Sequence, residues 1–287
     1  MEKQSNDAKK PKKQHSAPAR NWVGDNGKII EPLFADYFLS LHPMRCFQGR
    51  LFTVDGMVED EAPLKKEIYE QIRYYATTSV ARRIEHIMQA IKLACASEPP
   101  EIQTDRIHVR NGTYFVDGHF TPEKEYCMNR LPIAYVPDAP APTHWLQFLN
   151  ELLYEEDIPA LQEYIGYCLL PVTKAQKMLL MVGKGGEGKS RIGLILRELF
   201  GNSMYTGSLQ KVETNRFARA DLEYKLLLVD DDMKTEALPQ TNNIKTLVTL
   251  EDKIDIERKG QQSVQGTLYV RFACFGNGSL HALYDKS

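Results

Sequence analysis

The stretch GKGGEGKS, which begins at Gly183, constrains the fold of this chain more than any other. It follows an apolar run from Met178 to Val182 and precedes an apolar helical pattern that ends near Phe200, before Gly201. An apolar strand without polar alternation is typical of a sheet that is covered on both faces. A strand, a glycine loop and a helix in this order predict an α/β domain with a parallel sheet.

The loop fits the pattern GxxxxGK[ST] of a P-loop that binds nucleotide phosphates. Backbone amides that all point at phosphate oxygens need backbone angles that side chains obstruct, and half of these eight residues are glycine. We expect Lys189 to reach the β- and γ-phosphates of ATP and Ser190 to ligate Mg²⁺. The expected nucleotide-binding residues are Gly183, Lys184, Gly185, Gly186, Glu187, Gly188, Lys189 and Ser190.

A second motif supports the same chemistry. The largely apolar stretch from Lys225 to Val229 ends in an acidic triplet that begins at Asp230. Strand-terminal carboxylates are where P-loop proteins hold their metal, so we expect Asp230 in the Mg²⁺ shell. Asp231 is then expected to orient or deprotonate the attacking water. A solvated acidic turn is the alternative, which the apolar residues just before the triplet disfavour.

The short interval between Lys189 and Asp230 leaves little room for an inserted domain and favours a compact motor protein. A further apolar stretch over residues 268–275 leads to Asn277. We expect this polar side chain to lie at a strand end beside the first two motifs.

An alternating strand over residues 253–258, a turn and a short return strand near Val264 predict a hairpin with a cationic tip. Cations on such a tip can grip DNA phosphates without reading sequence. The alternative is a solvated hairpin in which Asp255 and Glu257 balance the cations.

Composition limits the class of protein. Charged residues make up 26% and apolar residues 43% of the chain, as is typical of a folded globular protein. No apolar run approaches the ~18 residues of a membrane span, and the amino terminus lacks the hydrophobic stretch of a secretory signal. The five cysteines are never spaced as CxxC, so the sequence favours a cytoplasmic protein with reduced thiols.

Cations crowd the first twenty residues against two acids. A short run rich in Lys, Pro, Ser and Gln cannot bury enough apolar area to offset its ordering entropy. We therefore predict a basic disordered tail over residues 1–30, which aids solubility or touches nucleic acid through its charge.

From Glu31 onward the pattern is globular, with helical periodicity over residues 62–75 and 79–96 and a hairpin signal at Arg110-Asn111-Gly112. The proline-rich run at residues 137–142 is stiff and breaks helices, so we place a domain boundary there. This gives a smaller mixed α+β domain over residues 31–140 and the P-loop ATPase domain over residues 141–287.

The order of these motifs resembles that of superfamily 3 helicases, in particular phage and plasmid primase-helicases of the satellite-phage type, which are similar to the poxvirus primase-helicase. The resemblance extends to residues 107–112 and 164–167, which look like the family's helicase-associated amino-terminal region. It implies an AAA+-like P-loop fold preceded by a helicase-associated domain.

The resemblance also implies roles for individual residues. Residues 183–190 correspond to motif A, the acids to motif B, and Asn277 to the γ-phosphate sensor of motif C. The implied catalytic residues are Lys189, Asp230, Asp231 and Asn277, and the implied DNA contacts of the hairpin are Lys253, Arg258 and Lys259.

The implied activity is ATP-dependent unwinding of DNA, with Mg²⁺, during replication of a phage, plasmid or other mobile element. Members of the family act as hexameric rings on single-stranded or forked DNA, so a homo-oligomer is expected. Two departures concern Ser287, which follows Asn277 closely, and the region before Glu31, which holds no primase domain. We therefore expect a truncated ATPase domain, lacking the arginine that serves a neighbouring subunit, and a separate primase as partner.

Two other functions compete with a helicase. A truncated, non-motor protein would bind ATP and DNA or oligomerise, but would not displace a strand. A small-molecule kinase would carry an arginine-rich lid after the second motif, and residues 233–243 contain no arginine.

Overall fold

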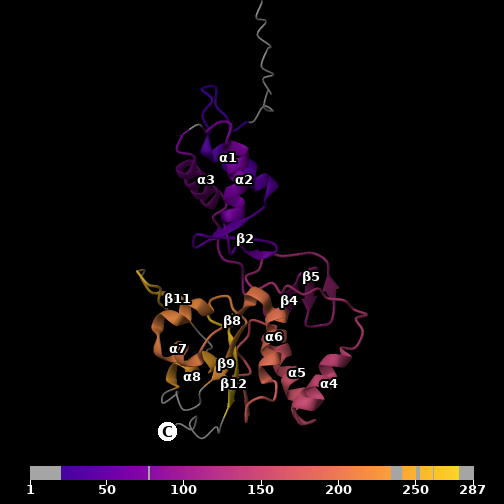
Figure 1. The fold of residues 1–287 in the computed structure, drawn as a ribbon. Helices are drawn as coiled ribbons and strands as arrows, with labels where there is room; N and C mark the ends of the chain where they lie inside the picture. The colour runs from indigo at the N-terminus through magenta and orange to yellow at the C-terminus, as the bar shows by residue number, and fades with distance from the viewer. Residues whose placement is uncertain (1–20, 77, 234–240, 250–252, 261, 278–287) are drawn as a thin grey trace, which may run out of the picture. The chain divides into compact units, whose positions relative to one another are not determined.

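The computed structural model describes residues 21–76, 78–233, 241–249, 253–260 and 262–277 (Figure 1). Its contacts divide the chain into two compact units. One unit contains the described residues up to Leu51 together with Glu59–Ser97, and the other contains Phe52–Val58 and the described residues from Glu98 onward.

The first unit is built mainly from three helices, α1 (Glu31–Leu41), α2 (Ala62–Ile72) and α3 (Val80–Ala94). Both α1 and α2 pack on α3, which buries Ile87 and Ile91 at the helical spacing that the sequence predicted. Three short strands lie between α1 and α2 in the sequence and form one sheet, β1 (Arg45–Phe47), β2 (Arg50–Thr53) and β3 (Gly56–Met57), of which β3 and the end of β2 are counted with the second unit. Gln48 and Gly49 connect the first two strands, which are neighbours in this sheet.

The start of the first unit differs from the predicted tail. Residues 1–20 lie outside the described part of the chain, but Trp22 is 1% exposed. Its ring packs edge-on against Phe34 at 4.8 Å and Tyr75 at 5.2 Å between centroids. An aromatic ring of this size buries enough apolar area to order the segment that carries it, so residues 21–30 belong to the folded unit.

A small sheet opens the main part of the second unit. It contains β4 (Arg106–Val109), β5 (Gly112–Phe115) and β6 (Phe120–Thr121), and Val109 pairs with Gly112 across a two-residue turn. The predicted Asn-Gly hairpin is therefore present. A Cβ on Gly112 would lie 2.1 Å from the carbonyl oxygen of Thr121, so only glycine fits this close approach.

The predicted boundary at residues 137–142 does not coincide with the division between the units. Leu131 is buried in the same apolar core as Leu149 and Phe200, and Ser203 Oγ donates to the carbonyl oxygen of Arg130 at 3.5 Å. These contacts, which lie far apart in the sequence, pack residues 98–140 with the α/β part of the chain. Local proline content could not reveal them.

The sheet of the α/β part has the order β7-β12-β9-β8, and all three strand pairs are parallel. Its strands are β7 (Leu179–Gly183), β8 (Met204–Thr206), β9 (Leu227–Met233) and β12 (Arg271–Asn277). The predicted mixed α/β fold with a parallel sheet is confirmed. β12 lies between the strand that enters the glycine loop and the strand that carries the acids.

Apolar cores on both faces hold this sheet. Phe272 and Cys274 of β12 contribute to one core, while Ala273 and Phe275 contribute to the other, as expected for a strand buried on both faces. The first core contains residues of α7 (Leu209–Thr214), α8 (Asn242–Thr249) and β10 (Ile254–Ile256). The second contains residues of α4 (Thr143–Leu152), α5 (Asp157–Cys168) and α6 (Lys189–Phe200). The remaining elements are η1 (Gly201–Ser203), η2 (Arg216–Leu222) and β11 (Val264–Gly266).

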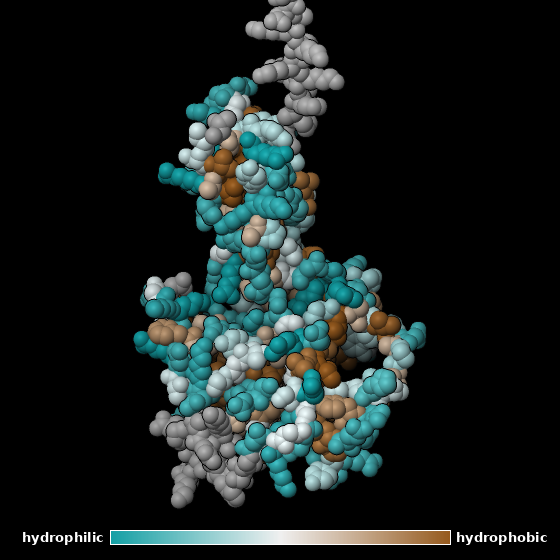
Figure 2. Space-filling view, in the orientation of Figure 1, coloured by the Kyte–Doolittle hydropathy of each residue, from teal (hydrophilic) through white to brown (hydrophobic). Residues whose placement is uncertain are grey.

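The surface is mainly hydrophilic in the view of Figure 2, with apolar residues exposed in separate patches. Of the helices that the structure describes, none combines the length and the apolar character that a membrane crossing needs.

Candidate nucleotide-binding site

The glycine loop connects β7 to α6 at the carboxyl edge of the parallel sheet. Gly185, Gly186 and Gly188 have φ angles of 98°, 81° and 105°, in the left-handed region that side chains disfavour. A Cβ on Gly183 would lie 2.8 Å from both carboxylate oxygens of Glu187 and from Lys189 Nζ. The backbone path therefore requires glycine at positions 185, 186 and 188, whereas the contacts at Gly183 involve the flexible ends of two side chains, which can move.

Lys189 and Asn277, predicted from separate motifs, meet beside this loop. Lys189 is only 9% exposed, and its Nζ donates to Asn277 Oδ1 at 3.3 Å. Asn277 pairs in register with Gly183, and its Oδ1 lies 3.7 Å from the Cβ position of Gly185. A buried ammonium and a polar amide thus face the space enclosed by the loop.

Glu187 occupies the inside of the loop. Its carboxylate accepts hydrogen bonds from the backbone N–H of Lys184, from that of Gly185 at 3.0 Å, and from Lys189 Nζ at 2.6 Å. The Lys189 ammonium, followed by the Lys184 amide, lowers the pKa of the Glu187 carboxyl to about 2. The loop is therefore an anion-binding loop that holds a carboxylate of its own. This contact was not predicted, although Glu187 stands within the motif.

The two acids at the end of β9 face opposite sides of the sheet. Asp230 is 7% exposed, and its Oδ2 accepts a hydrogen bond from the backbone N–H of Leu209 at the start of α7, at 2.7 Å. Burial raises the pKa of the Asp230 carboxyl. Asp231 Oδ1 lies 3.9 Å from the Cβ position of Gly193 on α6, on the side to which Val229 also points.

This geometry changes the roles expected for Asp230 and Asp231. Side chains alternate along a strand, so only one of two neighbours can face the helix that follows the glycine loop. That residue is Asp231, whereas Asp230 stabilises the start of α7. The metal role predicted for Asp230 fits the position of Asp231 better.

Ser190 is exposed in the first turn of α6, beside the loop. Within the described ranges, no three His, Cys, Asp or Glu side chains gather into a metal-binding group. A Mg²⁺ ion commonly takes one or two protein oxygens and completes its shell with water and phosphate oxygens. The Ser190 hydroxyl and the Asp231 carboxylate are ligands of this kind, so the residues fit such an ion.

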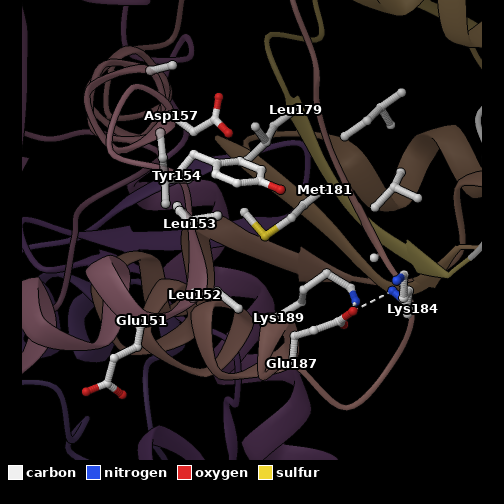
Figure 3. Close-up of a pocket in the computed structure, with 15 residues that line it drawn as sticks. Glu151, Leu152, Leu153, Tyr154, Asp157, Leu179, Met181, Lys184, Glu187 and Lys189 are labelled. Atoms are coloured by element: carbon white, nitrogen blue, oxygen red, sulfur yellow. Dashed lines mark hydrogen bonds and ion pairs between the residues drawn. The ribbon is translucent and has the colours of Figure 1, made fainter.

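A cavity of about 630 Å³ opens next to the loop (Figure 3). Lys189 and Glu187 lie at one end of it, and the connection between α4 and α5 forms a wall. Its apolar and aromatic lining residues include Leu152, Leu153, Tyr154, Leu161, Leu179 and Met181. The sequence alone does not predict this wall, because only the packing of α4 and α5 brings it to β7.

The predicted hairpin is present as β10 and β11, paired from Ile254↔Gly266 to Ile256↔Val264. Lys253 and Lys259 are exposed at the surface. Arg258 instead donates to Glu223, whose side chain is 8% exposed. The structure therefore assigns Arg258 to a largely buried ion pair.

The acids of the hairpin also have partners on the protein. Glu257 Oε2 lies 3.3 Å from Arg216 Nε, and Asp255 accepts a hydrogen bond from Gln265. In the structure, these two acids therefore contact Arg216 and Gln265. These contacts compete with the alternative prediction that the acids balance the cations of the hairpin.

Two family models match parts of the chain. Residues 27–153 match the model described as D5 N terminal like, and residues 181–287 match a family of unknown function, DUF5906. No curated protein matches the chain.

Solved structures give a likeness in fold. The apo structure of the NrS-1 C terminal region is 14% identical, with a TM-score of 0.55, over 86% of this chain and 57% of that one. An A form of the same apo region is 13% identical, with a TM-score of 0.51, over 86% and 56%. A JCV helicase with a bound small molecule is 18% identical over 47% and 40%, but its TM-score of 0.32 is too low to indicate a shared fold.

The chain spans little more than half of the length of the NrS-1 structures that it matches. The chain therefore shares its fold with the NrS-1 C terminal region over most of its length.

Proposed function

We propose that this chain binds and hydrolyses ATP at the glycine loop. The observation that carries the proposal is the meeting of three separate sequence motifs at one edge of a parallel sheet. The loop presents backbone amides, β12 presents Asn277 next to Lys189 Nζ, and β9 presents Asp231 beside α6. A loop of amides with one ammonium, backed by a carboxylate, suits a triphosphate.

Each residue has a proposed role in this reaction. Lys189 binds the β- and γ-phosphates, and Asn277 senses the γ-phosphate from the neighbouring strand. Ser190 and Asp231 hold Mg²⁺, which neutralises charge on the phosphates when bound. Asp230 holds Asp231 and α7 in position through its hydrogen bond to Leu209.

The cavity supports a place for the rest of the nucleotide. Its volume of about 630 Å³ lies in the range of small-molecule sites, which combine apolar walls with a few polar groups. We propose that base and ribose lie along Leu153, Tyr154 and Met181, which line the cavity next to the loop.

We further propose that ATP hydrolysis drives unwinding of DNA in the manner of superfamily 3 helicases. The D5-type match over residues 27–153 and the exposed lysines of the β10-β11 hairpin support this function. Lys253 and Lys259 are the proposed contacts to DNA phosphates, which need no sequence-specific recognition. The setting is replication of a phage, plasmid or other mobile element, by a hexameric ring working with a separate primase.

The test is hydrolysis of ATP with and without single-stranded DNA. We expect DNA to stimulate turnover in the wild type, and Lys189→Ala to lower it by about 100-fold or more, because the β- and γ-phosphates lose their buried cation. Lys177→Ala, which removes an exposed lysine just before β7, is the matched control and should behave as wild type. Normal DNA-stimulated turnover in Lys189→Ala would eliminate the proposed site.

Strand displacement on a forked duplex separates the motor from the non-motor alternative. ATP turnover and DNA binding without displacement would mean that the chain binds nucleotide and DNA but does not unwind.

A further inference from the structure

The glycine loop holds an anion that belongs to the protein itself. The Glu187 carboxylate is bound by the backbone N–H groups of Lys184 and Gly185 and by Lys189 Nζ. Two backbone amides and an ammonium around one anion are the donor set that a phosphate group takes in such a loop. Figure 3 shows Glu187 and Lys189 together at the end of the cavity.

The two backbone amides cannot serve two anions at once. Each backbone N–H has a single proton, and Lys189 Nζ lies only 2.6 Å from Glu187 Oε2. A phosphate that entered beside the carboxylate would also meet a second negative charge at close range. A polyphosphate and the Glu187 carboxylate are therefore mutually exclusive occupants.

We propose that Glu187 is an internal competitor for polyphosphate, which sets the nucleotide affinity of the loop. Nucleotide then occupies the loop only when the carboxylate turns out of it. The Glu187 side chain is 37% exposed, so solvent lies within reach of the displaced group. This inference rests on the proposed function, and it assigns Glu187 a role opposite to that of its neighbours in the loop.

The competitor is charged throughout the physiological range. The pKa of Glu187 is lowered to about 2 by Lys189 and the Lys184 amide, so the carboxylate is ionised near neutral pH. Protonation therefore does not release it under ordinary conditions, and displacement has to come from the entering anion.

The experiment measures binding of magnesium–ATP and of magnesium–pyrophosphate by calorimetry to the wild type, Glu187→Gln and Glu198→Gln. Glutamine keeps the size of the side chain and removes its charge. Glu198 is an exposed acid of α6, so Glu198→Gln changes the net charge equally without touching the loop. Circular dichroism melting checks that each variant is folded.

We expect Glu187→Gln to tighten both ATP and pyrophosphate binding by about tenfold or more, because charge-assisted hydrogen bonds no longer have to be broken. Glu198→Gln should match the wild type. Unchanged or weaker binding in Glu187→Gln would overturn the inference, as would equal tightening in Glu198→Gln, or tightening for ATP without pyrophosphate.

These outcomes separate the inference from the proposed function. If the wild type and Glu187→Gln bind ATP equally tightly, the proposed role of Glu187 is rejected and the nucleotide site is retained. If folded wild type and folded Glu187→Gln both fail to bind ATP and pyrophosphate, the nucleotide site and the inference fall together.

Discussion

At the scale of single residues, the site depends on which side of a strand a carboxylate faces. Asp230 and Asp231 are neighbours with the same chemistry, and the sequence alone assigned the metal to the first. In the structure Asp230 is buried against the start of α7, while Asp231 lies on the side of α6. Successive side chains of a strand point to opposite faces of the sheet. A shift of one residue therefore decides which of the two acids faces α6.

The two acids should respond differently to truncation. Asp231→Ala should lower magnesium-dependent ATP turnover by about 100-fold and leave the melting temperature close to wild type. Asp230→Ala should lower the free energy of unfolding by about 1–3 kcal/mol, because the buried N–H of Leu209 loses its acceptor.

Turnover assays and urea unfolding of both variants check this prediction. A large loss of stability in Asp231→Ala, with normal stability in Asp230→Ala, would contradict the assignment.

At the scale of secondary-structure elements, the β10-β11 hairpin shows how tertiary contacts divide a run of cations. The sequence grouped Lys253, Arg258 and Lys259 as one DNA-binding set. Arg258 is instead paired with Glu223, a side chain that is 8% exposed, whereas Lys259 lies exposed at the turn. The hairpin itself was predictable from the alternation of apolar and polar residues. The ion pair of Arg258 was not, because its partner Glu223 is distant in the sequence.

Alanine variants of the two cations separate these roles. Lys259→Ala should weaken DNA binding and reduce the slope of log affinity against log salt by about one, because one phosphate contact is lost. Arg258→Ala should instead lower the free energy of unfolding by about 2 kcal/mol, because it leaves a largely buried carboxylate without its partner.

Salt titrations of DNA binding, together with urea unfolding, measure both effects. If Arg258→Ala lost DNA affinity with unchanged stability, the ion pair would not be its main role.

At the scale of the whole molecule, the proposed helicase requires several copies of the chain. The conditions for assembly follow from the proposed site: nucleotide with Mg²⁺ in the loop, and single-stranded DNA at the hairpins. We expect sedimentation velocity to show a large assembly, consistent with a hexamer, only when ATP, Mg²⁺ and single-stranded DNA are all present.

Lys189→Ala provides the control for this prediction, since it should remain small under the same conditions. A wild-type chain that stays monomeric in the presence of all three would favour the non-motor alternative.

The sequence by itself determined the class of the α/β part and most of its motifs. The apolar runs of β7 and β9, the glycine loop and the Asn-Gly hairpin are local patterns, since they depend on backbone angles and on burial of short segments. For the same reason the short strands β6 and β8 escaped prediction, because too few residues carry their pattern. The predicted boundary near residues 137–142 does not match the division between the two units. The reason is that Leu131 packs with residues that are distant in the sequence.

Only the tertiary structure decided how the motifs act together. It placed β12 between β7 and β9, so that Asn277 meets Lys189, and it set Asp231 rather than Asp230 towards α6. It also put the Glu187 carboxylate among the loop's own amides. The physical reason is that hydrogen bonds and charges act over a few ångströms in space, while the sequence specifies only which groups are available to come that close.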